Sequence, residues 1–301
     1  MEVVAGVLGA VADLAVIRYK GTFMQNFSGK LVLITGGSSG IGLALAQQFF
    51  AAGANLWILG RSMEKLQNSV IEIDKFRHNK EQFIHTAAVD VTDYQVAAQK
   101  LNSMIDQDGT PDILINSAGA TMPGKFEDLD IKIFQELMEV NYYGTVNVIK
   151  ALIPHFISRK SGHIVNISSI AGFGGVYGYT AYCASKYAVR GFSDALRPEM
   201  KPYGIKVSVV FPPDTETPQL AFEEPYKPAI TKELSANAAA MTADAVARSI
   251  IKGISKGSYI IAPGEASFWF FMSNFLGKLT YPVMDLMIKD AQKKVARKSG
   301  N

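Results

Sequence analysis

The sequence predicts an α/β fold, with a doubly wound parallel sheet of about seven strands, helices on both faces and a single domain. Short apolar runs alternate with helical segments, and the first run leads into a glycine cluster. Strands that are apolar throughout and separated by helices are typical of a parallel sheet covered on both faces. The expected strands are Leu31–Thr35, Leu56–Leu59, Ile84–Val89, Ile113–Ile115, His163–Ile167, Lys206–Phe211 and Tyr259–Ala262. No internal repeat or break in composition marks a second domain.

The composition excludes several classes of protein. Apolar residues make up 48% of the 301 residues and charged residues 19%, which suits a packed globule and not a disordered chain. The formal net charge of +3 is spread over both signs, so no nucleic-acid partner is expected. Cys183 is the one cysteine, which fits a reducing, cytoplasmic compartment. The four histidines lack metal-ligand spacing, and no metal site is predicted.

Both ends of the chain differ from the predicted α/β domain, residues 29–263. The N-terminal segment, residues 1–28, contains an apolar stretch that is too short to cross the ~30 Å hydrocarbon core. It also lacks the basic region and the cleavage site of a secretory signal. The C-terminal segment, residues 264–301, is rich in aromatic residues and closes with lysines and an arginine. This pattern suits peripheral contact with a membrane, at the cytosolic face of the endoplasmic reticulum in a eukaryote. A dimer contact or a helix covering the sheet is the alternative.

A glycine-rich turn joins the first strand to the first helix. It reads Thr35-Gly36-Gly37-Ser38-Ser39-Gly40-Ile41-Gly42. Glycines let the backbone turn tightly and approach a pyrophosphate, while the helix N-terminus offers free N–H groups and a positive dipole end. Because the turn follows the first strand of a repeated β–α pattern, it predicts a Rossmann-type dinucleotide site. The expected contacts are Gly36, Ser38, Ser39, Gly40, Ile41 and Gly42.

The end of the second strand indicates which dinucleotide binds. Sites for NAD carry an acid there, which would repel a 2′-phosphate, whereas this chain has Gly60 and Arg61. A guanidinium offers a hydrogen-bonding fork to phosphate, so the predicted cofactor is NADPH/NADP+. The alternative is that Arg61 is a solvated surface charge. Further cofactor contacts are expected at the ends of the third and fourth strands, from Asp90 to the adenine and from Asn116, Ala118 and Gly119.

A second group of residues carries the predicted chemistry. Tyr182 and Lys186 are four residues apart, so they share one face of a helix. Alone, this pair is typical of a protein surface. However, Ser168 and Ser169 end an apolar strand upstream, and Asn141 lies on a predicted helix before that.

These motifs, in this order and spacing, resemble the short-chain dehydrogenase/reductase superfamily from about Gly29 to about Tyr259. The resemblance implies that Tyr182 donates a proton to a carbonyl oxygen and that Ser169 donates a hydrogen bond to the same oxygen. It implies that Lys186 lowers the pKa of Tyr182 and holds the cofactor ribose, and that Asn141 holds a water linked to Lys186. It also implies a homodimer or homotetramer, formed through long helices that include the one carrying Tyr182.

The loop after the sixth strand narrows the resemblance. It reads Phe211-Pro212-Pro213-Asp214-Thr215-Glu216-Thr217-Pro218, where the superfamily usually begins the loop with Pro-Gly. The Pro-Pro-Asp-Thr run resembles 3-ketodihydrosphingosine reductases, although Gln219 stands where that family tends to have glycine. In the resemblance Pro212, Thr215 and Thr217 contact the cofactor. The implied reaction is NADPH-dependent reduction of 3-ketosphinganine to sphinganine.

Such a lipid-like amino ketone would need an apolar channel that ends at Tyr182. The candidate lining residues are Phe173, Tyr177, Tyr179, Leu220 and Phe222, with ordinary loop packing as the alternative. Three other functions stay open. The first is a reductase of a steroid, retinoid or 3-oxoacyl substrate, the second is a non-catalytic NADP(H)-binding sensor, and the third is a membrane-organising protein.

Overall fold

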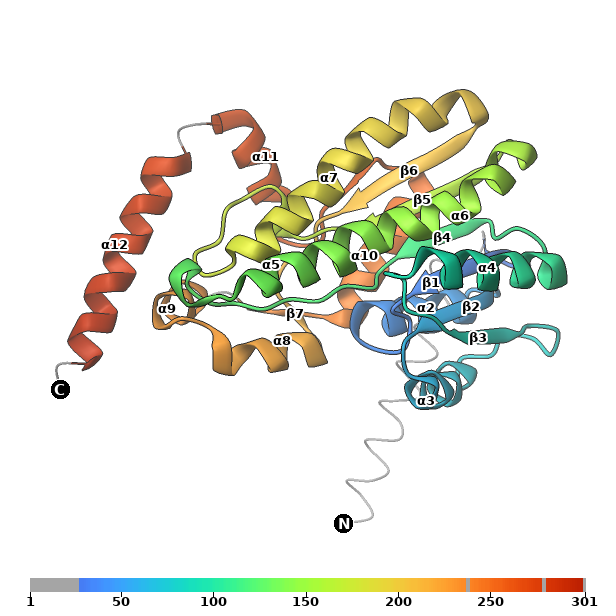
Figure 1. Ribbon diagram of the computed structural model, residues 1–301, viewed down its shortest axis with the longest axis horizontal. Helices are drawn as coiled ribbons and strands as arrows, with labels where there is room; N and C mark the ends of the chain where they lie inside the picture. The colour runs from blue at the N-terminus through green and yellow to red at the C-terminus, as the bar shows by residue number, and fades with distance from the viewer. Residues whose placement is uncertain (1–26, 237–238, 278–279, 300–301) are drawn as a thin grey trace, which may run out of the picture.

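The central feature of the computed structural model is a seven-stranded parallel sheet, as the sequence predicts (Figure 1). The structure describes residues 27–236, 239–277 and 280–299. The strand order is β3-β2-β1-β4-β5-β6-β9, and every neighbouring pair is parallel. The strands are β1 (Leu31–Thr35), β2 (Asn55–Gly60), β3 (Ile84–Ala88), β4 (Ile113–Asn116), β5 (Gly162–Ile167), β6 (Ile205–Val210) and β9 (Ile260–Ile261).

Helices cover both faces of this sheet. Their bounds are α2 (Gly40–Ala51), α3 (Met63–Asp74), α4 (Tyr94–Asp108), α5 (Ile131–Met138), α6 (Gly144–Arg159), α7 (Thr180–Met200) and α10 (Ala243–Lys256). Apolar side chains of α2, α3 and α10 form one buried cluster with the sheet. Side chains of α4, α6 and α7 form a second cluster on the opposite face. The result is the three-layered arrangement expected of strands that are apolar on both faces.

The strand order reverses at β1, which places a ligand crevice at the carboxyl ends of β1 and β4. The register aligns three polar side chains at this edge of the sheet. Thr35 of β1 lies opposite Asn116 of β4, and Asn116 lies opposite Asn166 of β5. The segments that follow these strands therefore meet at the point where a dinucleotide binds in such folds.

An insertion between β6 and the last strand adds structure that the sequence did not predict. Its elements are β7 (Thr215–Glu216), α8 (Pro218–Glu223), α9 (Ala229–Ser235) and β8 (Met241–Thr242), and β7 pairs in parallel with β8. The proline-rich span Pro212–Pro228 indicates an insertion over a site, but two-residue strands leave no periodic pattern from which these elements could be predicted. The insertion lies over the carboxyl ends of the sheet strands (Figure 1).

The C-terminal segment forms α11 (Ala266–Leu276) and α12 (Thr280–Ser299). Phe270 of α11 stacks on Phe211, with ring centroids 5.1 Å apart. Figure 1 shows α12 standing away from the sheet, with α9 beside it, and Lys298 and Lys294 reach Glu233 of α9 at 2.7 and 3.7 Å. Within the described part of the chain, no helix combines the length and apolarity that a membrane crossing requires. The predicted apolar N-terminal segment falls outside the described residues, apart from its last two positions.

Candidate active site

The turn after β1 is packed so closely that only glycine fits at two of its positions. A Cβ atom on Gly42 would lie 2.3 Å from the carbonyl oxygen of Gly36, and one on Gly36 would lie 2.9 Å from the backbone of Ala118. Gly36 also has a φ of 68°, in the left-handed region. Ser39, at the N-cap of α2, makes no side-chain capping bond, so it does not occupy the first N–H groups of this helix. The start of α2 therefore presents uncapped N–H groups at the positive end of the helix dipole, which is the arrangement that binds a phosphate.

This turn forms one wall of a cavity of about 380 Å³ at the carboxyl ends of the strands. The loop after β4, the end of β5, α7 and the insertion α8–α9 form its other walls. Most of the residues that the sequence singles out line it, namely Gly36, Ser39, Gly40, Ile41, Gly42, Ala118, Gly119, Ser169, Tyr182, Lys186, Pro212, Thr215 and Thr217. These residues come from five separate stretches of the chain, which thus converge on one cavity.

Five of the predicted residues lie outside the lining of this cavity. Arg61 follows β2 and Asp90 lies beyond β3, both exposed, and Asp90 accepts hydrogen bonds from the backbone and hydroxyl of Thr92. Ser38 lies beside Gly60, where its hydroxyl would be 3.4 Å from an added Cβ. Asn116 is buried and donates to Asn166 Oδ1 at 2.9 Å, so its side chain joins β4 to β5. Asn141, the fifth of these residues, lies beneath the loop after β4.

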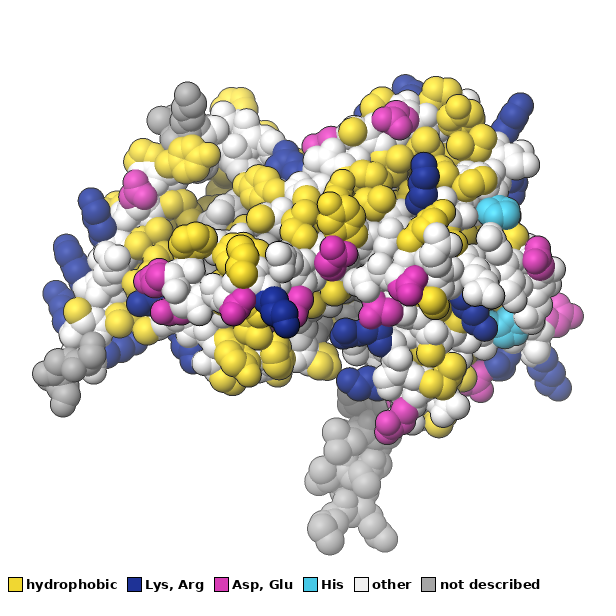
Figure 2. All heavy atoms as spheres, in the orientation of Figure 1, with side chains coloured by type: hydrophobic (Ala, Val, Ile, Leu, Met, Phe, Trp, Pro, Cys, Tyr) yellow, Lys and Arg dark blue, Asp and Glu magenta, His cyan; other side chains and the backbone are white. Residues whose placement is uncertain are grey.

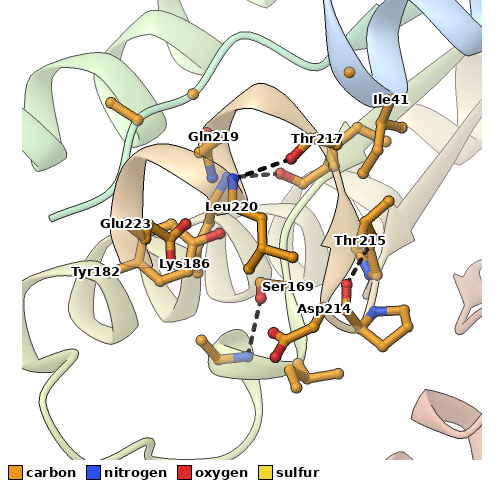
Figure 3. Close-up of a pocket in the computed structure, with 18 of the residues that line it drawn as sticks. Ile41, Ser169, Tyr182, Lys186, Asp214, Thr215, Thr217, Gln219, Leu220 and Glu223 are labelled. Atoms are coloured by element: carbon orange, nitrogen blue, oxygen red, sulfur yellow. Dashed lines mark hydrogen bonds between the residues drawn. The ribbon is translucent and has the colours of Figure 1, made fainter. Parts of the chain in front are cut away.

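The predicted catalytic side chains converge at the end of the cavity formed by β5 and α7 (Figure 3). Tyr182 and Lys186 share one face of α7, and the Lys186 ammonium lies 5.7 Å from the Tyr182 ring centroid. Ser169 follows β5, its Oγ accepts from the N–H of Ala171 at 3.2 Å, and its hydroxyl acts on Tyr182 by lowering the pKa of the phenol. The ammonium of Lys186 donates to the backbone oxygen of Ile167 at 3.0 Å. A phenol and a hydroxyl therefore meet where a carbonyl oxygen could receive both.

Burial raises the pKa of Tyr182 above its usual range, the hydrogen bond with Ser169 opposes this rise, and the charge of Glu223 adds to it. This differs from the expectation that Lys186 would lower the pKa of Tyr182. The physical reason is that Lys186 is itself buried, which lowers its pKa to about 8, and that its ammonium bonds to Ile167. The phenol consequently keeps its proton at neutral pH, which is the form that a proton donor needs.

Asn141 holds the loop after β4 in place. It lies on a π-helical turn, Glu139–Tyr143, between α5 and α6. Its side-chain amide accepts from the N–H of Ala120 at 2.8 Å and donates to the oxygens of Ala120 and Ser185, each at 2.9 Å. An added Cβ on Gly119 would lie 3.0 Å from Asn141 Oδ1 and 3.4 Å from Lys186 Nζ. Asn141 is therefore close to Lys186 but uses both amide atoms to position neighbouring backbone.

A comparison with family models assigns this architecture. The model described as short chain dehydrogenase matches residues 30–226, which include the glycine turn and the Ser169–Tyr182–Lys186 group. The chain belongs to the short-chain dehydrogenase/reductase superfamily. Membership implies a nicotinamide cofactor, and the glycine turn fits one, since it lines the cavity beside a helix N-terminus whose first N–H groups have no side-chain cap.

Relatives of this short-chain reductase include proteins of more than one name. It is 39% identical over 233 residues to the 3-dehydrosphinganine reductase of Danio rerio, covering 77% of this chain and 70% of that one. It is 40% identical over 194 residues to the dehydrogenase/reductase SDR family member 7B of Xenopus tropicalis, covering 64% and 62%. Among solved structures, levodione reductase aligns with a TM-score of 0.73 at 24% identity, covering 80% of this chain and 98% of that one. Identity alone therefore leaves the substrate of this short-chain reductase open.

The predicted substrate channel is only partly present in this short-chain reductase. Tyr179 and Leu220 line the cavity. The prediction was wrong for the other three residues, for which ordinary loop packing was the better interpretation. Phe173 is buried against Phe211 and Phe270, Phe222 is exposed, and Tyr177 lies outside the lining.

Acidic residues of the cavity were missed by sequence reasoning. Asp214 and Glu223 both line it, and Tyr179 donates a hydrogen bond to Glu223 at 2.6 Å. The signal for Asp214 was its place in the Pro-Pro-Asp-Thr run, next to Thr215 and Thr217. Glu223 is the first of two adjacent glutamates on a short helix, and nothing in the local sequence shows that it faces inward while Glu224 faces solvent.

Proposed function

We propose that this protein is an NADPH-dependent ketone reductase that converts 3-ketosphinganine to sphinganine. The observation that supports it most is that Ser169, Tyr182 and Lys186 line the same cavity as the glycine turn that follows β1. The retention of the complete catalytic group favours catalysis over a non-catalytic sensor.

In this reaction, the nicotinamide cofactor supplies, when bound, a hydride to the carbonyl carbon. As negative charge develops on the carbonyl oxygen, Ser169 donates a hydrogen bond to it and Tyr182 transfers its phenolic proton. The C=O bond becomes a secondary alcohol, and the tyrosinate that remains takes a proton from solvent to complete the cycle. Lys186, whose ammonium is bonded to the backbone oxygen of Ile167, lines the same cavity and is positioned to hold the cofactor ribose.

Arg61 supports NADPH as the cofactor. It follows β2 directly and precedes Ser62, whose hydroxyl caps α3 by accepting from the N–H of Lys65 at 3.3 Å. A 2′-phosphate placed there would meet both the guanidinium and the positive end of a helix dipole. Arg61 is exposed, so it is free to reach a ligand at this edge of the sheet.

Replacing Arg61 with alanine is expected to lower the preference for NADPH over NADH by about ten- to a hundredfold, the effect of one charge-assisted hydrogen bond. The measurement is kcat/KM for the two cofactors at a fixed ketone concentration. The loss should fall on NADPH alone, because NADH carries no 2′-phosphate. An unchanged ratio would show that Arg61 is a solvated surface charge.

The substrate is supported by the Pro-Pro-Asp-Thr loop in the cavity wall and by the 39% identity to proteins named for 3-dehydrosphinganine. The test is to supply 3-ketosphinganine with NADPH and to detect sphinganine by mass spectrometry. A steroid ketone, a retinal and a 3-oxoacyl thioester serve as competing substrates. We expect the highest kcat/KM for 3-ketosphinganine. A higher value for any competitor would remove the sphingolipid assignment and leave ketone reduction standing.

We extend the proposal to peripheral contact with a membrane, from which a lipid-like ketone would be collected. Exposed apolar side chains on α11 and α12 support it. Figure 2 shows lysine and arginine side chains beside apolar ones in this C-terminal part of the chain. The exposed residues are Phe268, Trp269, Phe271, Phe275, Tyr281, Val283, Leu286 and Met287. Aromatic and basic residues together suit the membrane interface. A homodimer or homotetramer through long helices that include α7 is also part of this proposal.

A further inference from the structure

The cavity contains a buried carboxylate that the proton-transfer chemistry does not use. Glu223, the last residue of α8, lines the cavity and is 7% exposed. Its Oε2 accepts a hydrogen bond from the hydroxyl of Tyr179, and the rings of Tyr179 and Tyr182 are 6.0 Å apart. In Figure 3 the Glu223 carboxylate lies on the same side of the cavity as Tyr182 and Lys186. A buried carboxylate is costly unless a cation pairs with it.

The cations around Glu223 are already engaged elsewhere. Lys227 has a buried side chain, lines the cavity and acts on Glu223 through its charge, but its ammonium pairs with Oε2 of Glu224 at 3.0 Å and forms no ion pair with Glu223 within 4.0 Å. Lys186 donates to the backbone oxygen of Ile167. Among the described residues, neither Glu223 nor the neighbouring Asp214 takes part in an ion pair within 4.0 Å.

Burial raises the pKa of Glu223, with Asp214 adding to the rise, while the hydrogen bond from Tyr179, the charge of Lys227 and a hydrogen bond with Gln219 lower it. Because the net shift is upward, these partners do not fully offset the cost of burying the charge. An ammonium brought in by a ligand would supply further positive charge and would in turn be held in its protonated form.

We propose that Glu223 binds the ammonium group of a 2-amino ketone and so makes this reductase selective for amino ketones over neutral ketones. The inference rests on the proposed function. In such a ketone the nitrogen is carried by the carbon next to the carbonyl. When the carbonyl oxygen lies between Ser169 and Tyr182, the ammonium is necessarily close to that pair. Glu223 lines the same cavity and bonds to Tyr179, whose ring lies 6.0 Å from that of Tyr182, so it lies beside this position.

This assignment separates the candidate substrates by charge. A steroid, a retinoid or a 3-oxoacyl chain has no cation to pair with Glu223 and would leave the buried carboxylate without an ion-pair partner. Specificity of this kind comes from the cost of the unpaired group as well as from the attraction to the right ligand.

The test compares two ketones of equal chain length, 3-ketosphinganine and its analogue with hydrogen in place of the amino group. Glu223→Gln keeps the shape of the side chain and an acceptor for Tyr179 but removes the charge. We expect kcat/KM for the amino ketone to fall by about ten- to a hundredfold, mainly through KM, while the value for the deaminated ketone stays within about twofold or rises. Glu199→Gln, which changes an exposed glutamate of α7, is the charge-matched control and should alter neither value.

Tyr179→Phe distinguishes binding of the ligand from a structural role of Glu223. It removes the hydrogen bond to Glu223 but leaves the carboxylate, so it should preserve the preference for the amino ketone. Equal losses for both ketones in Glu223→Gln, or no loss for either, would overturn the inference while ketone reduction stands. Failure of the wild-type protein to reduce either ketone with NADPH would instead overturn the proposed function, and the inference with it.

Discussion

Replacing Tyr182 with phenylalanine is expected to lower kcat for ketone reduction by about 10²- to 10⁴-fold, the contribution typical of a positioned general acid. The substitution removes one hydroxyl and keeps the ring that packs between Tyr179 and Lys186. Ser169 would still donate to the carbonyl oxygen, but no group of the described site would replace the proton. The measurement is the single-turnover rate of NADPH oxidation, because it reports the chemical step separately from product release.

Tyr187→Phe is the matched control, since Tyr187 lies on the same helix and is 42% exposed. It should leave kcat unchanged. Binding of NADPH and the thermal midpoint of Tyr182→Phe should also stay close to wild type. Residual activity near the wild-type level would mean that a different group donates the proton and that the convergence of Ser169 and Tyr182 has another purpose.

The sheet could be predicted because its strands are buried on both faces. Most of them are short apolar runs such as Leu31–Thr35, and the observed bounds differ from the predicted ones by no more than one residue at either end. The glycine turn could also be placed, because a tight strand-to-helix turn at a fixed point of the β–α pattern has a strong local signal.

The substrate side of the cavity could not be predicted in the same way. α8 and α9 are each under three turns long, and the two-residue strands β7 and β8 carry no periodicity. Which of two adjacent glutamates faces inward depends on how α8 packs over Tyr179, which is a tertiary contact. The prediction that Lys186 lowers the pKa of Tyr182 was wrong for a related reason. The sequence places Lys186 beside it, but the depth of burial and the bond from Lys186 to Ile167 appear only in three dimensions.

Replacing Gly42 with alanine is expected to abolish tight cofactor binding and to destabilise the fold. The new Cβ would lie 2.3 Å from the carbonyl oxygen of Gly36, a backbone atom that cannot rotate away. The turn and the start of α2 would have to separate, and both supply the groups aimed at the pyrophosphate. Overpacking of this kind costs about 1–3 kcal/mol, and we expect the dissociation constant for NADPH to rise at least tenfold.

Gly191→Ala is the matched control for Gly42→Ala. Nothing lies within 4 Å of its added Cβ, and Gly191 occupies an exposed position inside α7. The extra methyl should stabilise the protein by about 0.5–1 kcal/mol, because alanine loses less backbone freedom than glycine on forming a helix. Thermal unfolding without NADPH measures the stability of each variant. The further rise in stability with NADPH measures cofactor binding, because a ligand stabilises the folded state more when its affinity is higher. If Gly42→Ala kept the full stabilisation by NADPH, the cofactor would have to bind away from this turn, and Tyr182 would no longer face the carbon that receives the hydride.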